Sequence, residues 1–285
     1  MKQLFYSNFY IFIILICAND ALAETAIPDE PPIQLEKVWV AEGFTEPEGV
    51  AVDGEILYIS NMVGADASQK DGAGWISKLS LNGELITEKW VDGLHAPKGM
   101  AVHQGKLYVS DVDAFHIIDI ATAQIQHTYP VDGAQFLNDI TVWQDEVYMS
   151  DSRTARIFRI DANGYSEWLT DPQLTGVNGL TADGNRLLIA AMESGALLET
   201  TDGVALKTLA TGMKNGDGIA VLDNGGYLVS SWPGQIWYAS TQGEVTKLFD
   251  TEAAPMSQND LTRVGDLIIV PSKVPNIVTA WRVVD

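Results

Sequence analysis

The chain has 285 residues, and 46% of them are hydrophobic, which is enough for a substantial core and excludes an intrinsically disordered protein. Its formal net charge of −21 argues against a protein that binds nucleic acid or an anionic membrane surface, because an acidic surface repels phosphate groups. The same charge favours the binding of cations.

The N-terminal 23 residues have the pattern of a cleaved signal peptide. Lys2 gives a positively charged start, residues 10–18 are an unbroken apolar run, and Ala21–Ala23 form a small-x-small cleavage site. The alternative is an uncleaved membrane anchor, for which the apolar run is short. We expect a mature chain that begins near Glu24 and is secreted or exported to a bacterial periplasm. Cys17 is the only cysteine and would be removed with the signal peptide, so we expect no thiol chemistry in the mature protein.

One short phrase recurs six times along the rest of the chain. It appears as PEGVAV with Glu48 in second place, PKGMAV with Lys98, LNDITV with Asn138, VNGLTA with Asn178, GDGIAV with Asp217 and QNDLTR with Asn259. Each phrase is followed by a turn and a second apolar stretch, and then by further short strands joined by Gly or Asn turns. Four short antiparallel strands in about 40 residues have the size of one propeller blade.

The repeat therefore predicts an all-β fold, a six-bladed β-propeller with four antiparallel strands per blade over residues 35–285, preceded by an N-terminal segment at 24–34. The sixth unit has only three strands before the chain ends, while the strand LEKVWV at 35–40 belongs to no unit. We expect this N-terminal strand to complete the sixth blade and close the ring, which removes exposed strand edges. A β-sandwich, the alternative, would not explain six nearly equal periods.

The second residue of each phrase is the candidate functional position, because the first strand of a blade is innermost and begins near the central axis. The six residues at this position are Glu48, Lys98, Asn138, Asn178, Asp217 and Asn259. Ordinary turns would favour Gly, Asn or Asp here, and Glu48 fits that alternative poorly. Carboxylate and amide oxygens without imidazole or thiolate suit Ca²⁺ and disfavour zinc. The pattern therefore predicts a divalent metal, with Ca²⁺ favoured, in the central channel.

The loops that follow the second strands are expected to rim this site. They begin at Asn61, Asp111, Asp151, Met192, Trp232 and Ser272. The longest loop, residues 61–74, is either a lid or a surface insertion. His95 is a candidate ligand-positioning residue or general base, or simply a loop histidine, and Lys98 is a substrate anchor or the counter-charge of Glu48. The candidate substrate pocket contains Lys98, His95, Asn61, Asp111, Phe136, Asp151, Met192, Trp232, Asn259 and Asp260.

The Glu-Gly, Asn-Asp, Asn-Gly and Asp-Gly pairs of four of these phrases resemble the family of senescence marker protein, gluconolactonase and drug-responsive lactonase, which are six-bladed propellers distantly related to paraoxonases. The resemblance implies that Glu48, Asn178 and Asp217 hold a divalent metal and that Asn138 binds it directly or through water. It also implies hydrolysis of lactones or related esters, in which the ion polarises the carbonyl group and Asp217 is the best candidate for the general base.

Two departures from the family pattern bear on the substrate. Phe136 stands where sugar-lactonase members often carry an arginine, and Ile140 replaces a glycine. With Met192 and Trp232, Phe136 suggests a more apolar pocket, so an aliphatic or aromatic lactone is a possible substrate. Asp139 either turns inward beside Asn138 or caps the strand start.

Two other functions remain open at this stage. A non-catalytic propeller would bind a ligand or a partner protein and keep its metal as a structural ion. A lyase propeller is the third alternative.

Overall fold

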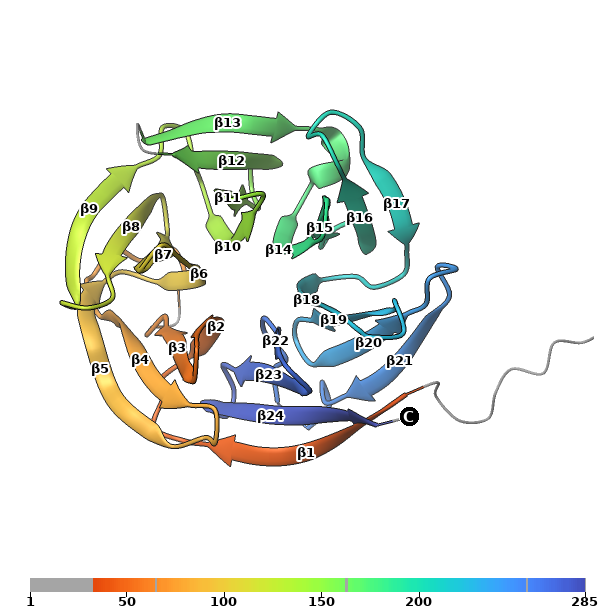
Figure 1. The fold of residues 1–285 in the computed structure, drawn as a ribbon, viewed down its shortest axis with the longest axis horizontal. Coiled ribbons are helices and arrows are strands. Elements are labelled where there is room, and N and C mark those ends of the chain that lie inside the picture. The colour runs from red at the N-terminus through yellow and green to blue at the C-terminus, as the bar shows by residue number, and fades with distance from the viewer. Residues whose placement is uncertain (1–32, 65, 162–163, 255, 285) are drawn as a thin grey trace, which may run out of the picture. The chain divides into compact units, whose positions relative to one another are not determined.

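The structure is a computed structural model that describes residues 33–64, 66–161, 164–254 and 256–284. The predicted signal peptide lies outside these residues. The described chain forms six four-stranded antiparallel sheets arranged in a ring, so the predicted six-bladed β-propeller is confirmed (Figure 1). Within the described ranges, no helix is long and apolar enough to cross a membrane.

The blades follow one another along the chain. Blade 1 contains β2 (Pro47–Asp53), β3 (Ile56–Asn61), β4 (Gly74–Ser80) and β5 (Leu85–Leu94). Blade 2 contains β6 (Pro97–His103), β7 (Lys106–Asp111), β8 (Ala114–Asp119) and β9 (Gln124–Pro130). Blade 3 contains β10 (Leu137–Trp143), β11 (Glu146–Asp151), β12 (Arg156–Asp161) and β13 (Gly164–Thr170). Blade 4 contains β14 (Val177–Asp183), β15 (Arg186–Ala191), β16 (Ala196–Thr200) and β17 (Lys207–Ala210), and blade 5 contains β18 (Gly216–Val221), β19 (Tyr227–Ser231), β20 (Gln235–Ala239) and β21 (Val245–Asp250).

Blade 6 joins the two ends of the domain. Its strands are β22 (Thr262–Val264), β23 (Leu267–Ser272), β24 (Ile277–Val284) and the N-terminal β1 (Gln34–Ala41), in the order β22-β23-β24-β1. The antiparallel pairing of β1 with β24 runs from Gln34 opposite Val284 to Ala41 opposite Val278 (Figure 1). The N-terminal strand therefore closes the ring, as the incomplete sixth repeat predicted.

The hydrophobic core lies between neighbouring blades. Between blades 1 and 2, for example, Ala51, Tyr58 and Ile76 pack with Met100 and Leu107. Full burial of a large aliphatic side chain contributes about 1.5–3 kcal/mol, so these interfaces hold the blades together. The second strands are apolar over consecutive residues, as in ILYI at 56–59 and LLIAA at 187–191, because both faces of a blade are buried.

The inner strands share a β-bulge at the residues that begin the repeated phrase. In β2 the pairing with β3 shifts between Pro47 and Val50, and β6, β10, β14 and β18 shift at the equivalent place. A bulge bends the strand and re-aims its side chains. Serine hydroxyls of the second strands accept the bulge N–H groups, and these bonds join Gly49 to Ser60 (2.8 Å), Asp139 to Ser150 (2.9 Å) and Gly218 to Ser230 (2.8 Å).

Candidate metal centre in the central channel

The six residues at the second place of the phrase are all buried around the start of the inner strands. They are Glu48, Lys98, Asn138, Asn178, Asp217 and Asn259, and their exposed fractions lie between 1% and 6%. Each comes from a different blade, so the ring closure brings together residues as much as 211 positions apart. We call this set the channel ring.

The channel ring has more negative than positive charge. Burial and the nearby carboxylates of Asp260 and Asp139 together raise the pKa of Glu48 to about 8, against the opposing effect of Lys98. Burial also raises the pKa of Asp217 well above its ordinary value, with added repulsion from Glu48 and Asp139. Buried like charges disfavour ionisation, and a cation among them would restore it. The electrostatics of the channel therefore favour a bound cation.

The two amides of the channel ring next to these carboxylates are held by their nitrogen ends. Asn138 Nδ2 donates to Ser152 Oγ at 3.1 Å, and Asn178 Nδ2 donates to Met192 Sδ at 3.4 Å. Asn178 Oδ1 is buried and has no hydrogen-bond partner in the described structure. Leaving such a group unpaired costs about 1–3 kcal/mol, so an electropositive ligand at this oxygen would be stabilising.

The donor set therefore fits a hard divalent cation. Two carboxylates and two amide oxygens are ligands that Ca²⁺ accepts in irregular geometry. No group of three or more His, Cys, Asp or Glu side chains in the described ranges is placed to hold a metal, so a site here depends on the amides. That composition again disfavours zinc.

The two remaining members of the channel ring are engaged with the backbone. Asn259 Oδ1 accepts a hydrogen bond of 3.1 Å from the N–H of Lys273, and Lys98 Nζ donates to Ala96 O at 3.0 Å. Burial lowers the pKa of Lys98 to about 8, against the opposing effect of Glu48. Lys98 and Glu48 thus act on one another electrostatically, and the role of Lys98 as a substrate anchor stays a prediction.

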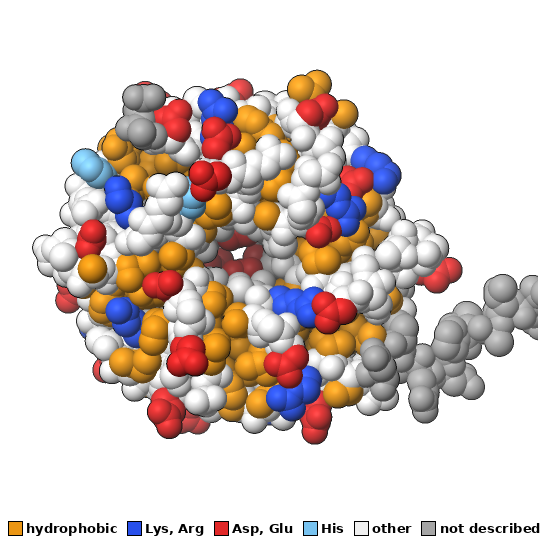
Figure 2. Space-filling model, viewed as in Figure 1, with side chains coloured by type: hydrophobic (Ala, Val, Ile, Leu, Met, Phe, Trp, Pro, Cys, Tyr) orange, Lys and Arg blue, Asp and Glu red, His pale blue; other side chains and the backbone are white. Residues whose placement is uncertain are grey.

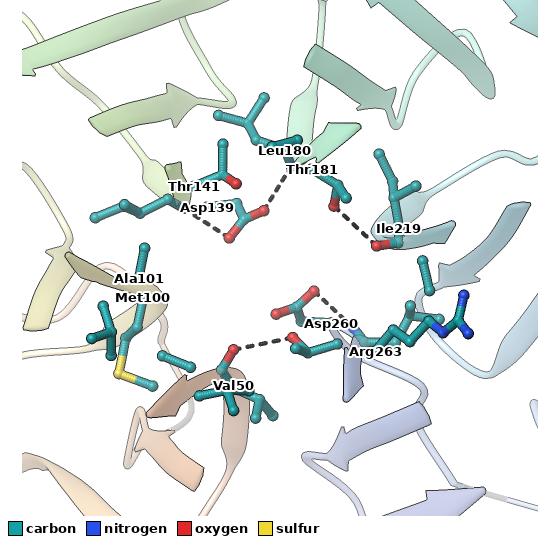
Figure 3. Close-up of a pocket in the computed structure, with 18 of the residues that line it drawn as sticks. Val50, Met100, Ala101, Asp139, Thr141, Leu180, Thr181, Ile219, Asp260 and Arg263 are labelled. Atoms are coloured by element: carbon teal, nitrogen blue, oxygen red, sulfur yellow. Dashed lines mark hydrogen bonds between the residues drawn. The ribbon is translucent and has the colours of Figure 1, made fainter. Parts of the chain in front are cut away.

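Asp139 and Asp260 form a second layer along the channel. Asp139 Oδ2 accepts a hydrogen bond from Leu180 N of the next blade at 2.6 Å, and Asp260 Oδ1 accepts one from Leu261 N at 2.7 Å (Figure 3). Burial raises the pKa of Asp139 to about 7. Asp139 therefore turns into the channel, which answers the question that the sequence left open. The sign of this in the sequence is the Asn-Asp pair, since the other four phrases have Gly in the third place.

A cavity of about 650 Å³ fills the part of the channel beyond this second layer. It is lined by apolar residues of the inner strands, including Val50, Met100, Ile140, Leu180, Ile219 and Leu261, together with polar and charged side chains such as Asp139, Asp260 and Arg263. Figure 2 shows the hollow at the centre of the ring, with acidic side chains inside it. Of the predicted site residues, only Asp260 lines this cavity, so the cavity and the channel ring lie at different depths of one channel.

Three predicted pocket residues anchor the loops that precede the inner strands. Asn61, Asp111 and Asp151 are at most 1% exposed. Asn61 Oδ1 accepts from Thr45 N at 2.9 Å, and Asp151 Oδ1 accepts from Phe136 N at 2.9 Å. These side chains hold the loop that leads into the inner strand of their own blade, and they are buried. The repeated Ser-Asn or Ser-Asp at the ends of β3, β7 and β11 is the sequence pattern that marks this role.

The other predicted pocket residues are more dispersed. His95 Nδ1 accepts a hydrogen bond of 3.1 Å from Gly72 N, so it ties the long loop to blade 2. Met192 contacts Asn178 of the channel ring, as described above, and Trp232 is 47% exposed. The structure therefore brings Met192 close to the candidate centre and gives His95 a loop-holding contact.

Two cationic side chains contact the aromatic ring of Phe136. Lys98 Nζ lies 4.5 Å from the centroid of the Phe136 ring, and Arg153 Cζ lies 4.6 Å from it. Both distances are within the range of cation–π attraction. The position where sugar-lactonase members often carry an arginine thus holds an aromatic ring that contacts both a buried lysine and an exposed arginine.

Comparisons with known proteins concern the fold. No family model and no curated protein sequence matches the chain. Among solved structures, it is similar to a gluconolactonase from Xanthomonas campestris (TM-score 0.65, 14% identity, 90% of this chain and 96% of that chain). It is also similar to virginiamycin B lyase from Staphylococcus aureus (TM-score 0.61, 14% identity, 88% and 99%) and to a chain of a nidogen/laminin complex (TM-score 0.61, 15% identity, 75% and 83%). Gluconolactonases are thus among the structural neighbours, and identities this low show the fold alone.

Proposed function

We propose that this protein is an exported, metal-dependent hydrolase of lactones or related esters, and that Ca²⁺ is its metal. The observation that carries the proposal is the convergence of Glu48, Asp217, Asn138 and Asn178 on one buried ring, where Asn178 Oδ1 has no partner among the described residues. The gluconolactonase among the structural neighbours supports the same class of reaction.

These four residues would hold the ion through their side-chain oxygens. When bound, a divalent cation would polarise the acyl carbonyl of the substrate and acidify a water molecule. In the reaction, the water oxygen bonds to the acyl carbon, the bond from that carbon to the ring oxygen breaks, and the ring oxygen takes a proton. The product is a hydroxy acid.

Asp217 is the better of the two carboxylates for accepting the proton of the attacking water. Lys98 favours the ionised form of Glu48 by its positive charge, whereas burial and the carboxylates of Glu48 and Asp139 raise the pKa of Asp217 and so its basicity. Asn178 of the channel ring acts on Asp217 in the opposite direction and favours its ionised form. We therefore assign general-base catalysis to Asp217.

The test is a screen of aliphatic, aromatic and sugar lactones with the purified mature protein, with and without a chelator. The proposal predicts hydrolysis that stops on chelation and returns with Ca²⁺, and a loss of at least about a hundredfold in kcat for Asp217→Asn. The exposed Asp132→Asn is the matched control and should keep full activity. Hydrolysis that persists in calcium-free Asp217→Asn protein would refute the proposal.

A non-catalytic propeller that binds a partner is the second candidate. It is favoured by the similarity to a chain of a nidogen/laminin complex. It is also favoured by the hydrogen bond from Leu180 N to Asp139, because a channel carboxylate that joins two blades has a structural role. This candidate predicts that Ca²⁺ raises the melting temperature while no substrate of the screen is turned over.

A further inference from the structure

Arg153 is a cation that has no anionic partner in the part of the chain that the structure describes. The sequence contains six arginines, and the other five form ion pairs with carboxylates. Among the described residues, Arg153 forms neither an ion pair nor a hydrogen bond, and its guanidinium lies over the ring of Phe136. In a chain with 38 acidic and 17 basic residues, carboxylates are abundant, so an arginine that pairs with none of them is available to a ligand.

The contact with Phe136 places this free guanidinium beside the candidate centre. Phe136 lies two residues before Asn138 of the channel ring, and its ring also contacts Lys98. Lys98 in turn interacts with Glu48. The exposed Arg153 and the buried Lys98 therefore place two positive charges near one another at the channel ring, in a protein whose net charge is strongly negative.

A purely structural role explains this arrangement poorly. Cation–π attraction at an exposed site is weak, and Arg153 and Lys98 repel one another. The carboxylate of Asp66 in the long loop is close enough to act on Lys98, but it accepts a hydrogen bond from Ser68 N and forms no ion pair with Arg153. An anion at Arg153 would relieve the repulsion.

We propose that the substrate carries a carboxylate that binds Arg153, with the apolar part of the substrate against Phe136. The planar guanidinium presents two parallel N–H groups that match a carboxylate, which a lysine does not. The inference rests on the proposed function and narrows its substrates to anionic lactones or esters. It also accounts for Phe136, because an aromatic ring supports the arginine and packs against an apolar substrate, but offers no hydrogen bond to a polyhydroxylated sugar.

The test compares two substrates that differ in one group, a γ-butyrolactone with a ring carboxylate and the same lactone with a neutral carboxamide. The wild-type protein should have the higher kcat/KM for the carboxylate. Arg153→Gln should lower the ratio of the two kcat/KM values by roughly tenfold, the usual effect of losing a hydrogen bond to a charged group. Arg153→Lys should restore part of the ratio. Arg159→Gln, which removes an arginine of the same blade that pairs with Glu146, is the matched control and should leave the ratio unchanged.

Binding of the hydroxy dicarboxylate product, measured by calorimetry at fixed Ca²⁺, separates this inference from the proposed function. Hydrolysis of both lactones with no preference, or a preference that Arg153→Gln retains, would overturn the inference and leave the proposed function standing. Product binding that depends on Arg153 without any hydrolysis would support anion recognition and overturn the proposed function. Absence of both hydrolysis and binding would overturn both.

Discussion

Asp139 of blade 3 accepts a hydrogen bond of 2.6 Å from the backbone N–H of Leu180 in blade 4. The same carboxylate accepts from Ile140 N at 2.7 Å, so one side chain fixes the starts of two inner strands. The bond therefore joins neighbouring blades directly at the channel, beside the residues that we assign to the metal.

Asp139→Ala should lower the free energy of unfolding by about 1–3 kcal/mol, because the buried N–H of Leu180 loses its acceptor. Asp139→Asn keeps one acceptor oxygen and removes a charge from a crowded acidic channel, so its effect should be smaller. Urea unfolding of both variants, with Asp132→Asn as the exposed control, measures the difference. Equal stability of wild type and Asp139→Ala would show that the interblade bond contributes nothing.

Gly179→Ala should disrupt the contact between blades 4 and 5. A Cβ at Gly179 would lie 1.9 Å from the carbonyl oxygen of Asp217, so the backbone that carries the candidate base would have to move. Gly216→Ala in β18 is the milder control, since its Cβ would meet nothing nearer than 3.2 Å. We expect Gly179→Ala to be much less stable or insoluble and Gly216→Ala to fold. Thermal unfolding checks both, and a Gly179→Ala protein with the stability of wild type would contradict the close packing of the inner strands.

Asp111 should make stability depend on pH in the acid range. Burial raises the pKa of Asp111, but hydrogen bonds from His116 and from the N–H groups of His95 and Ala96 outweigh it and hold the pKa below its ordinary value of 3.8. The unfolded state then binds more protons than the folded state, so this stabilisation is present above pH 3.8 and is lost as the pH falls through the folded-state pKa.

The measurement is the free energy of unfolding of wild type and Asp111→Asn across the acid range. The difference in free energy of unfolding between wild type and Asp111→Asn should be constant near neutrality and should become smaller as the pH falls. A difference that stays the same over the whole acid range would show that the charge of Asp111 is not involved.

The fold was predictable from the sequence because a propeller repeats its unit. Six phrases at intervals near 40 residues set the number of blades, and the unpaired strand at 35–40 identified the closure. The buried positions of Glu48 and Asp217 followed from the same count, because the start of every inner strand must lie near the axis.

The details of the site could not be predicted in the same way. A polar residue at the end of a second strand, such as Asp151, has the same sequence context whether it faces a pocket or binds backbone N–H groups of the preceding loop. Only the structure shows the second case. The inward turn of Asp139 likewise depends on the N–H of Leu180, which lies 41 residues away.

Calorimetric titration of the calcium-free mature protein with Ca²⁺ tests the central claim most directly. The account predicts binding in the channel ring, with affinity roughly tenfold lower or worse in Glu48→Gln and in Asn178→Ala, because each variant loses one oxygen ligand. Glu42→Gln, which changes an exposed carboxylate of blade 1's leading loop, should bind as wild type does. Absence of Ca²⁺ binding, or equal affinity in Glu48→Gln and wild type, would contradict the account.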